Sequence, residues 1–201
     1  MGMKKILFND RYGLTQAVLD GRKTQTRRIC KEQYWAFSDL VNAKNGIFHF
    51  EIPKYRIGEV VAVAQSYQDC GGFVNGIPQW DIIASQVGTK TLGWGNKLFV
   101  RADLMPHRIR IINVRVERLQ DISDEDVVKE GFSIENINNG WGNAAGHWEY
   151  ILTYLDGLGR YRQFRDRSAQ QAYAYLMDRI SGNGTWERNP FVFIYDFELI
   201  K

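Results

Sequence analysis

The stretch that decides the fold is Arg108-Ile-Arg-Ile-Ile-Asn-Val-Arg-Val-Glu-Arg118, which is rich in β-branched residues. Its apolar residues fall at positions 109 and 111 and then at 112, 114 and 116, so the alternation of a half-buried strand slips by one residue after Ile111. Such a slip predicts a β-bulge, which bends a strand sharply. Because a small closed barrel needs strongly bent strands, the stretch favours a compact β-barrel core.

Other segments supply the remaining strands and several short helices. Strands are expected over residues 5–8, 47–50, 60–63, 108–118 and 191–199, and helices over residues 14–18, 124–130 and 169–180. These elements do not alternate regularly enough for a doubly wound parallel sheet. We therefore expect an α+β fold, a small barrel decorated by short helices.

The helix over residues 124–130 has the best-marked ends. Ser123 is a good N-cap, Asp126 lies three residues later, and Asp124 and Glu125 complement the helix dipole. Gly131 follows as the expected end of the helix.

The length of 201 residues fits a single domain spanning residues 1–201. Two long loop excursions, at about residues 67–97 and 132–165, are rich in Gly, Asn and aromatic residues. The excursions contain four tryptophans, Trp80, Trp94, Trp141 and Trp148. We expect most of these to anchor the loops to the body, with base stacking as the alternative.

The composition excludes two classes of protein. With 44% hydrophobic and 24% charged residues and a net charge of +3, the chain is neither intrinsically disordered nor a polycationic nucleic-acid coat. Cys30 and Cys70 are far apart and not in a ligand-like spacing, which favours a reducing, cytoplasmic location. The apolar run at residues 6–8 is too short for a secretory signal or a membrane span.

Basic residues are concentrated in two places. The segment Gly21-Arg22-Lys23-Thr24-Gln25-Thr26-Arg27-Arg28 holds four cations, and a second set on the bent strand comprises Arg108, Arg110, Arg115 and Arg118. If the two sets meet, the modest net charge conceals a concentrated basic site. The first segment lacks the glycine pattern of a phosphate-binding loop. Because the three histidines are scattered, no metal site is expected, and we expect no cofactor.

Four blocks of the sequence resemble one family. They are residues 7–8 with Ala17-Val-Leu-Asp-Gly-Arg-Lys-Thr-Gln-Thr-Arg-Arg28, Ile57-Gly-Glu-Val-Val61, Val114-Arg-Val-Glu-Arg-Leu-Gln-Asp-Ile-Ser123 with Glu130-Gly131, and Asn189-Pro-Phe-Val192. In these blocks the chain resembles the ASCH domain of the PUA-like superfamily, in its longer phage and prophage form. The resemblance implies a small β-barrel with a basic cleft that binds RNA, a nucleotide or a modified nucleoside, without a membrane partner.

A short bacterial member of that family is an amidohydrolase that removes the acetyl group from 4-acetylcytidine. Its catalytic set of Lys, Thr and Glu falls by motif on Lys23, Thr26 and Glu130. From the two basic sets we expect the binding residues to be Arg22, Thr24, Arg27, Arg28, Arg108 and Arg110, in a cleft lined by residues 22–28, Arg108 or Arg110, and Glu130. Where longer members have an Arg-Glu pair, this chain has Ala64-Gln65, which favours an altered ligand site.

The implied chemistry is physically reasonable. A threonine hydroxyl becomes a nucleophile when a base removes its proton, and a lysine acts as that base if burial or nearby cations lower its pKa. Glu130 would orient Lys23 or help to protonate the leaving amine. In a regular strand, however, Lys23 and Thr26 would point to opposite faces, so the segment must curl for them to converge.

Three alternatives remain open at this stage. Lys23 and Glu130 would form a purely structural ion pair if the site has no catalytic role. The domain would then be a non-catalytic RNA-binding module, or a phage accessory protein that contacts a host protein through its aromatic excursions. The oligomeric state is left open as well.

Overall fold

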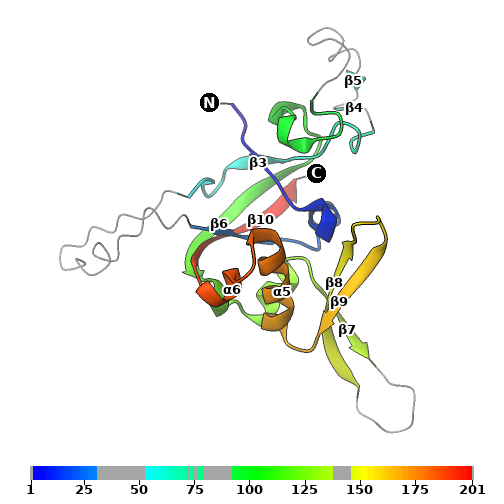
Figure 1. The fold of residues 1–201 in the computed structure, drawn as a ribbon. Coiled ribbons are helices and arrows are strands. Elements are labelled where there is room, and N and C mark those ends of the chain that lie inside the picture. Colours follow the sequence, from blue (N-terminus) through cyan, green and yellow to red (C-terminus); the bar gives the residue numbers. More distant parts are fainter. Residues whose placement is uncertain are drawn as a thin grey trace, which may run out of the picture.

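The computed structural model describes residues 2–30, 53–71, 73–74, 77–78, 92–137 and 146–200. These residues form an α+β structure whose main sheet has the strand order β1-β3-β6-β10-β2 (Figure 1). The strands of this sheet are β1 (Lys5–Ile6), β2 (Gln25–Ile29), β3 (Val60–Val63), β6 (Arg108–Arg118) and β10 (Phe191–Ile200). The α+β class and the strands near both ends of the chain are therefore confirmed. The strand expected over residues 47–50 lies outside the described residues.

The antiparallel pair β6 and β10 forms the axis of the sheet. Asp196 pairs with Asn113 and the next residue, Phe197, pairs with Ile111, so Ile112 is the extra residue of a bulge. The side chain of Ile112 is 51% exposed, whereas Ile109 and Ile111 are fully buried. The bulge predicted from the slipped alternation is confirmed.

The bulge decides which face of the sheet carries the polar residues of β6. Paired residues on antiparallel strands point to the same face. Gln25 pairs with Asp196 and Asp196 with Asn113, while Ile194 pairs with both Arg27 and Arg115. Because of the extra residue, Arg115 shares a face with Arg27; without it, Arg115 would point to the opposite face.

The expected closed barrel is not found among the described residues. There β1 pairs with β3 and β2 pairs with β10, and no ladder joins β1 to β2. The chain leaves the sheet after Ile6, so β1 is too short to reach β2. A side chain bridges this space instead, since Arg28 Nη2 donates to the Leu7 carbonyl oxygen at 2.5 Å.

Short helices surround the sheet. The α-helices are α1 (Leu14–Leu19), α4 (Asp124–Lys129), α5 (Ala169–Ser181) and α6 (Thr185–Arg188), and the 3₁₀ turns are η1 (Asp10–Tyr12), η4 (Lys97–Phe99), η5 (Ala102–Leu104) and η6 (Leu119–Asp121). Helix α4 begins as expected, because Ser123 Oγ accepts from the Asp126 amide at 3.2 Å. No helix in the described ranges is long and apolar enough to cross a membrane.

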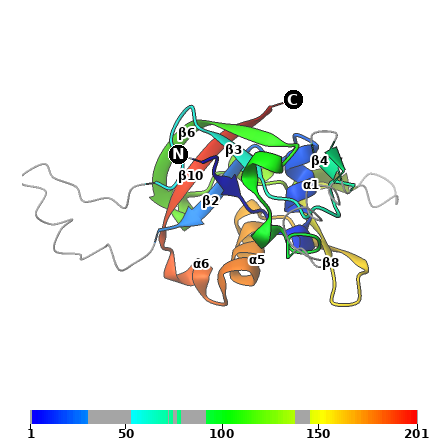
Figure 2. The same ribbon diagram turned by 90° about the horizontal axis from the view of Figure 1, so that it is seen from above.

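The main hydrophobic core lies against both faces of the central strands. Ile109, Ile111 and Phe197 are buried on one face, and Val192 and Ile194 on the other. Helices α5 and α6 lie beneath β2 and β10 in Figure 2, and α5 buries Ala172, Tyr173, Leu176 and Met177 in the same core.

The segment 132–165 is not the loop excursion that we expected. It carries an antiparallel sheet in the order β7 (Ser133–Ile137), β8 (His147–Leu155) and β9 (Tyr161–Asp166) (Figure 1). The period-two recurrence of aromatic and aliphatic residues at 148, 150, 152 and 154 was the available signal for β8. Residues 152 and 164 face α5, so the hairpin packs on the body of the domain.

The first excursion is described only in part. It contains a short hairpin of β4 (Phe73–Val74) and β5 (Ile77–Pro78), while Trp80, like Trp141, lies outside the described residues. Trp94 and Trp148 are 43% and 60% exposed. Trp148 is therefore not the anchor that we expected, because most of its surface lies in solvent, whereas Trp94 is covered over more than half of its surface.

The bulge gives a direct test of the fold. Deleting Ile112 should turn Arg115 and Glu117 to the wrong face and lower the free energy of unfolding by more than about 3 kcal/mol, because buried carboxylates lose their cations. The control Ile112→Thr should change it by less than about 1 kcal/mol, since the side chain is exposed. Urea unfolding followed by circular dichroism measures both. Equal stabilities of the two variants would contradict this account of the bulge.

Candidate functional site

A pocket of about 670 Å³ opens along the free edge of β2. Four consecutive β2 residues, 26–29, line it. Alternate side chains of a strand point to opposite faces of the sheet, so a pocket lined by consecutive residues wraps around the free edge of the sheet. The remaining wall comes from residues 7–11 and 14, Lys23, Lys97, Glu130, Tyr173, Leu176, Met177, Ile180 and Ser181. We call this the edge pocket.

Lys23 reaches the edge pocket because it lies before β2 begins at Gln25. Its backbone amide donates to the Ala17 carbonyl at 2.8 Å, and the amide of Thr24 donates to the Lys129 carbonyl at 2.9 Å. These bonds curl the segment, so strand alternation does not apply to Lys23. Lys23 and Thr26 consequently line the same pocket, which removes the geometric difficulty seen in the sequence.

Glu130 meets Lys23 at the end of α4. The Lys23 ammonium donates to Glu130 Oε2 at 2.5 Å and to the Glu130 carbonyl oxygen at 2.8 Å. Both side chains are buried, with 1% and 4% of their surface exposed. The chain turns here at Gly131, whose φ of +108° would strain any other residue, and a Cβ at Gly131 would lie 3.5 Å from that of Lys23.

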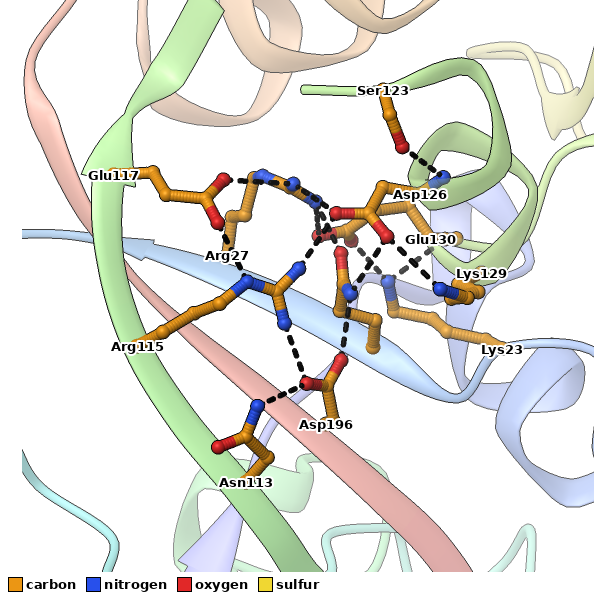
Figure 3. Close-up of polar contacts among 11 residues, drawn as sticks. Lys23, Arg27, Asn113, Arg115, Glu117, Ser123, Asp126, Lys129, Glu130 and Asp196 are labelled. Carbon is orange, nitrogen blue, oxygen red and sulfur yellow. Dashed lines mark hydrogen bonds and ion pairs between the residues drawn. The ribbon is translucent and has the colours of Figure 1, made fainter. Parts of the chain in front are cut away.

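Arg27 connects this pair to a larger charge network, which Figure 3 shows. The Arg27 side chain is fully buried and contacts Glu130 Oε1 at 3.3 Å and Asp126 Oδ2 at 2.8 Å. Its Nη1 also donates to the amide oxygen of Gln25. Within the part of the chain that the structure describes, Arg27 Nε is the buried side-chain nitrogen without a partner.

Asp126 is the centre of the network (Figure 3). It accepts from Arg115 Nη2 at 2.7 Å and from Gln25 Nε2 at 3.1 Å, in addition to Arg27. Arg115 Nη1 also contacts Asp196 at 2.6 Å. The network therefore joins α4 to β2, β6 and β10. We define the charge network by its charged members, Lys23, Arg27, Arg115, Glu117, Asp126, Lys129, Glu130 and Asp196.

The burial of the network shifts several pKa values. Burial lowers the pKa of Lys23 below its ordinary value, and the nearby Arg28 and Arg27 cations lower it further, although the Glu130 carboxylate opposes them. Burial would raise the pKa of Asp126, but hydrogen bonds from Arg27, Lys129 and Gln25 outweigh it and bring this pKa to about 2. Burial, followed by the Glu130 carboxylate, raises the pKa of Tyr173 well above 10.

Thr26 and Arg28 are the polar β2 residues left for a ligand. Thr26 is 4% exposed, and its hydroxyl makes no hydrogen bond within the described residues. Arg28 lies over the Phe8 ring, with 5.7 Å between the guanidinium carbon and the ring centroid. No carboxylate within the described ranges pairs with Arg28. Among the described residues, the edge pocket thus presents a hydroxyl without a hydrogen bond and a cation without a paired carboxylate.

Five of the residues singled out in the sequence come together in the edge pocket, namely Lys23, Thr26, Arg27, Arg28 and Glu130. The other four do not line it. Arg22 is exposed and pairs with Asp20, and Thr24 is exposed beside it. Arg108 and Arg110 pair with the C-terminal end of β10, whereas β2 pairs with its N-terminal half, so these two arginines lie apart from the basic segment along the sheet. Arg115 of the same set does meet Arg27, because both contact Asp126.

Sequence reasoning missed two residues of the site. Tyr173 lines the pocket beside Glu130, but its position in an amphipathic helix indicated only a core residue. Asp126 was identified as part of a helix cap, although its carboxylate is what holds Arg27 and Arg115. Gln65, at the position where longer family members have a charged pair, is buried and contacts His107 Nδ1 at 2.6 Å, away from the pocket.

The described residues contain no group of three His, Cys, Asp or Glu side chains that could hold a metal ion. Comparisons of the chain with protein-family models, curated proteins and solved structures give no match.

The charge network predicts a pH-dependent contribution to stability. At pH 7, Asp126→Asn should lower the free energy of unfolding by about 3 kcal/mol, because it leaves Arg27 and Arg115 without their shared carboxylate. Because the pKa of Asp126 is depressed to about 2 in the folded state, its contribution is present above about pH 5 and is lost as the pH falls to about 2. The stabilities of the wild type and the variant should therefore converge in acid.

Urea unfolding at several pH values measures this convergence. The control is Glu198→Gln, which removes an exposed ion pair with Arg110 and should cost less than about 1 kcal/mol at every pH. A constant difference between wild type and Asp126→Asn from pH 7 to pH 2 would show that Asp126 is not the titrating group.

Proposed function

We propose that the protein hydrolyses the amide of an acylated nucleoside of the 4-acetylcytidine type in the edge pocket. The observation that carries the proposal is the convergence of Lys23, Thr26 and Glu130 on one pocket, although they come from a curled segment, a strand and a helix end. The volume of about 670 Å³ lies in the range of small-molecule sites. Phe8, Leu176 and Met177 supply apolar surface for a base.

The buried pair supplies the base that the reaction needs. Burial lowers the pKa of Lys23 below its ordinary value, because the ammonium loses its hydration, so the neutral amine forms more readily than in solution. The Glu130 carboxylate and carbonyl oxygen hold the lysine nitrogen in place. The neutral amine is then available to accept a proton from the Thr26 hydroxyl.

The proposed reaction proceeds in two stages. Thr26 Oγ1 attacks the acyl carbon while Lys23 takes its proton, and the C–N bond breaks as Lys23 passes that proton to the leaving amine. The products are the free nucleoside and an acyl ester on Thr26. Water cleaves this ester: the neutral Lys23 amine takes a proton from the attacking water and gives it to the threonine oxygen, which releases the carboxylic acid. The Arg28 guanidinium, which no carboxylate within the described residues neutralises, is the cation available to the oxyanion.

The resemblance to ASCH domains supplies the substrate class. It is supported by the matching Lys-Thr-Glu set and by the two motifs, residues 21–28 and 114–123, that build the site. We also propose that the main sheet is a PUA-like barrel that is open at the edge pocket.

A non-catalytic RNA-binding module is the second candidate. The observation in its favour is that Lys23 is held twice by Glu130 in a buried pair, as a purely structural lysine would be. In that case Arg28 is the contact for the nucleic acid, because Arg27 is fully buried and engaged by carboxylates. RNA binding without turnover, weakened by Arg28→Gln, would favour this candidate.

The threonines of the basic segment give a matched test. Thr26→Val keeps the shape of the buried side chain and removes only its hydroxyl, so hydrolysis of 4-acetylcytidine should fall at least about 100-fold. Thr24→Val, at an exposed position outside the pocket, should leave the rate unchanged. Release of cytidine measured by liquid chromatography reports both rates. Equal rates for the two variants would remove Thr26 from the mechanism.

The electrostatics of Lys23 give a second test. If neutral Lys23 is the base, kcat/KM should rise with pH through an apparent pKa below 10.5, because burial and the Arg28 cation lower the pKa of Lys23. Arg28→Gln removes that cation, so its profile should shift to higher pH. The control Arg110→Gln, on a distant part of β6, should not move the profile. Superimposable profiles for wild type and Arg28→Gln would contradict this coupling.

A further inference from the structure

A second pocket, of about 550 Å³, lies beside the edge pocket. One wall is formed by β8 with Ser133 and Tyr161, and the other by η1, the start of α1, Arg22 and Gly131. We call it the sheet pocket. It is built by the three-stranded sheet β7–β8–β9, to which neither the sequence nor the proposed reaction assigns a role.

The two pockets are neighbours separated by one ridge. Lys23 and Glu130 line the edge pocket, and the residues next to them in the chain, Arg22 and Gly131, line the sheet pocket. Asp10 and Arg11 line both pockets. The 3₁₀ turn η1 is therefore the ridge that a ligand occupying both pockets has to cross.

Arg11 presents a free cationic edge on this ridge. Its Nε donates to the Leu155 carbonyl at 3.2 Å, which fixes the guanidinium against β8. Among the described residues no carboxylate pairs with Arg11, and its two Nη groups donate no hydrogen bond. Asp10, the nearest acid in sequence, is already paired with Lys97 at 2.6 Å. The ridge thus offers two N–H groups to an anion, the arrangement that suits a phosphate.

The sheet pocket beyond the ridge has the chemistry of a nucleotide site. The Tyr161 ring is 79% exposed at its rim, where a base can stack on it. Gln16, Ser133 and Thr153 are exposed lining residues. Gln16 Nε2 donates to Asp20 and Ser133 Oγ to the Ile151 carbonyl, so the Gln16 amide oxygen and the two hydroxyl oxygens are the acceptors offered to a sugar or base. Apolar surface beneath them comes from Ile151 and Leu155. An aromatic rim, polar contacts and a cation on one side together match one nucleotide unit.

We infer that the substrate is a single-stranded nucleic acid rather than a free nucleoside. The edge pocket takes the acylated nucleotide, Arg11 contacts the phosphate that links it to its neighbour, and the sheet pocket takes the neighbouring nucleotide. The inference rests on the proposed function for the edge pocket, but the sheet pocket and the ridge carry it independently of any catalytic step.

Binding of a fluorescently labelled hexaribonucleotide with one central 4-acetylcytidine tests the inference. Arg11→Gln should weaken its affinity about tenfold and lower the slope of log affinity against log salt by about one. Tyr161→Ala should weaken it about fivefold or more through loss of stacking. Fluorescence anisotropy measures these affinities. The matched controls are Arg101→Gln and Trp148→Ala, an exposed arginine and an exposed tryptophan outside both pockets.

Turnover separates this inference from the proposed function. Support requires that the hexanucleotide be the better substrate by kcat/KM and that Tyr161→Ala, at a residue of the sheet pocket outside the edge pocket, slow its hydrolysis without slowing that of the free nucleoside. If the hexanucleotide binds in an Arg11-dependent way but neither substrate is hydrolysed, the extended site stands and the hydrolase proposal fails. The inference is overturned, while the hydrolase stands, under two conditions. The nucleoside is hydrolysed, and the hexanucleotide binds no more tightly than the nucleoside, with an affinity that Arg11→Gln and Tyr161→Ala leave unchanged.

Discussion

The fully buried guanidinium of Arg27, held between Asp126 and Glu130, is the contact on which the site depends. A buried charge is tolerated only when opposite charges and hydrogen bonds surround it, and removing one partner is costly. Arg27 therefore requires that α4 and its C-terminal cap present Asp126 and Glu130 to β2. The same requirement places Lys23 beside Glu130, because Glu130 receives both cations at the end of α4.

The bulge at Ile112 extends this constraint to the rest of the sheet. It turns Arg115 toward Asp126 and Asp196, so that β6, β10 and α4 are held by shared carboxylates and not by apolar packing alone. Each cation in this cluster contacts at least one acid, which is why a chain rich in arginine shows so little free positive charge at its centre. Arg28 and Arg11, which line the edge pocket, pair with no carboxylate among the described residues.

Both pockets follow from the way the sheet ends. Because β1 leaves the sheet after Ile6, the edge of β2 is open, and the space beside it becomes the edge pocket instead of a strand pairing. The β7–β8–β9 sheet then packs against η1 and forms a second hollow on the other side of that turn. The buried lysine–glutamate pair thus lies at an open sheet edge, and a polar groove adjoins it.

The sequence by itself determined the α+β class, the bulge in β6 and the capped start of α4. These depend on local patterns, such as alternation and capping residues, which act over a few neighbouring residues. The grouping of Lys23, Thr26 and Glu130 as candidates came instead from the resemblance to ASCH domains. Only the tertiary structure decided that Arg27 is a buried structural cation, that Arg108 and Arg110 lie far along the sheet, and that segment 132–165 is a sheet. The physical reason is that burial, charge pairing and strand neighbours depend on residues about 100 positions apart, as with Arg27 and Asp126, and no local pattern encodes them.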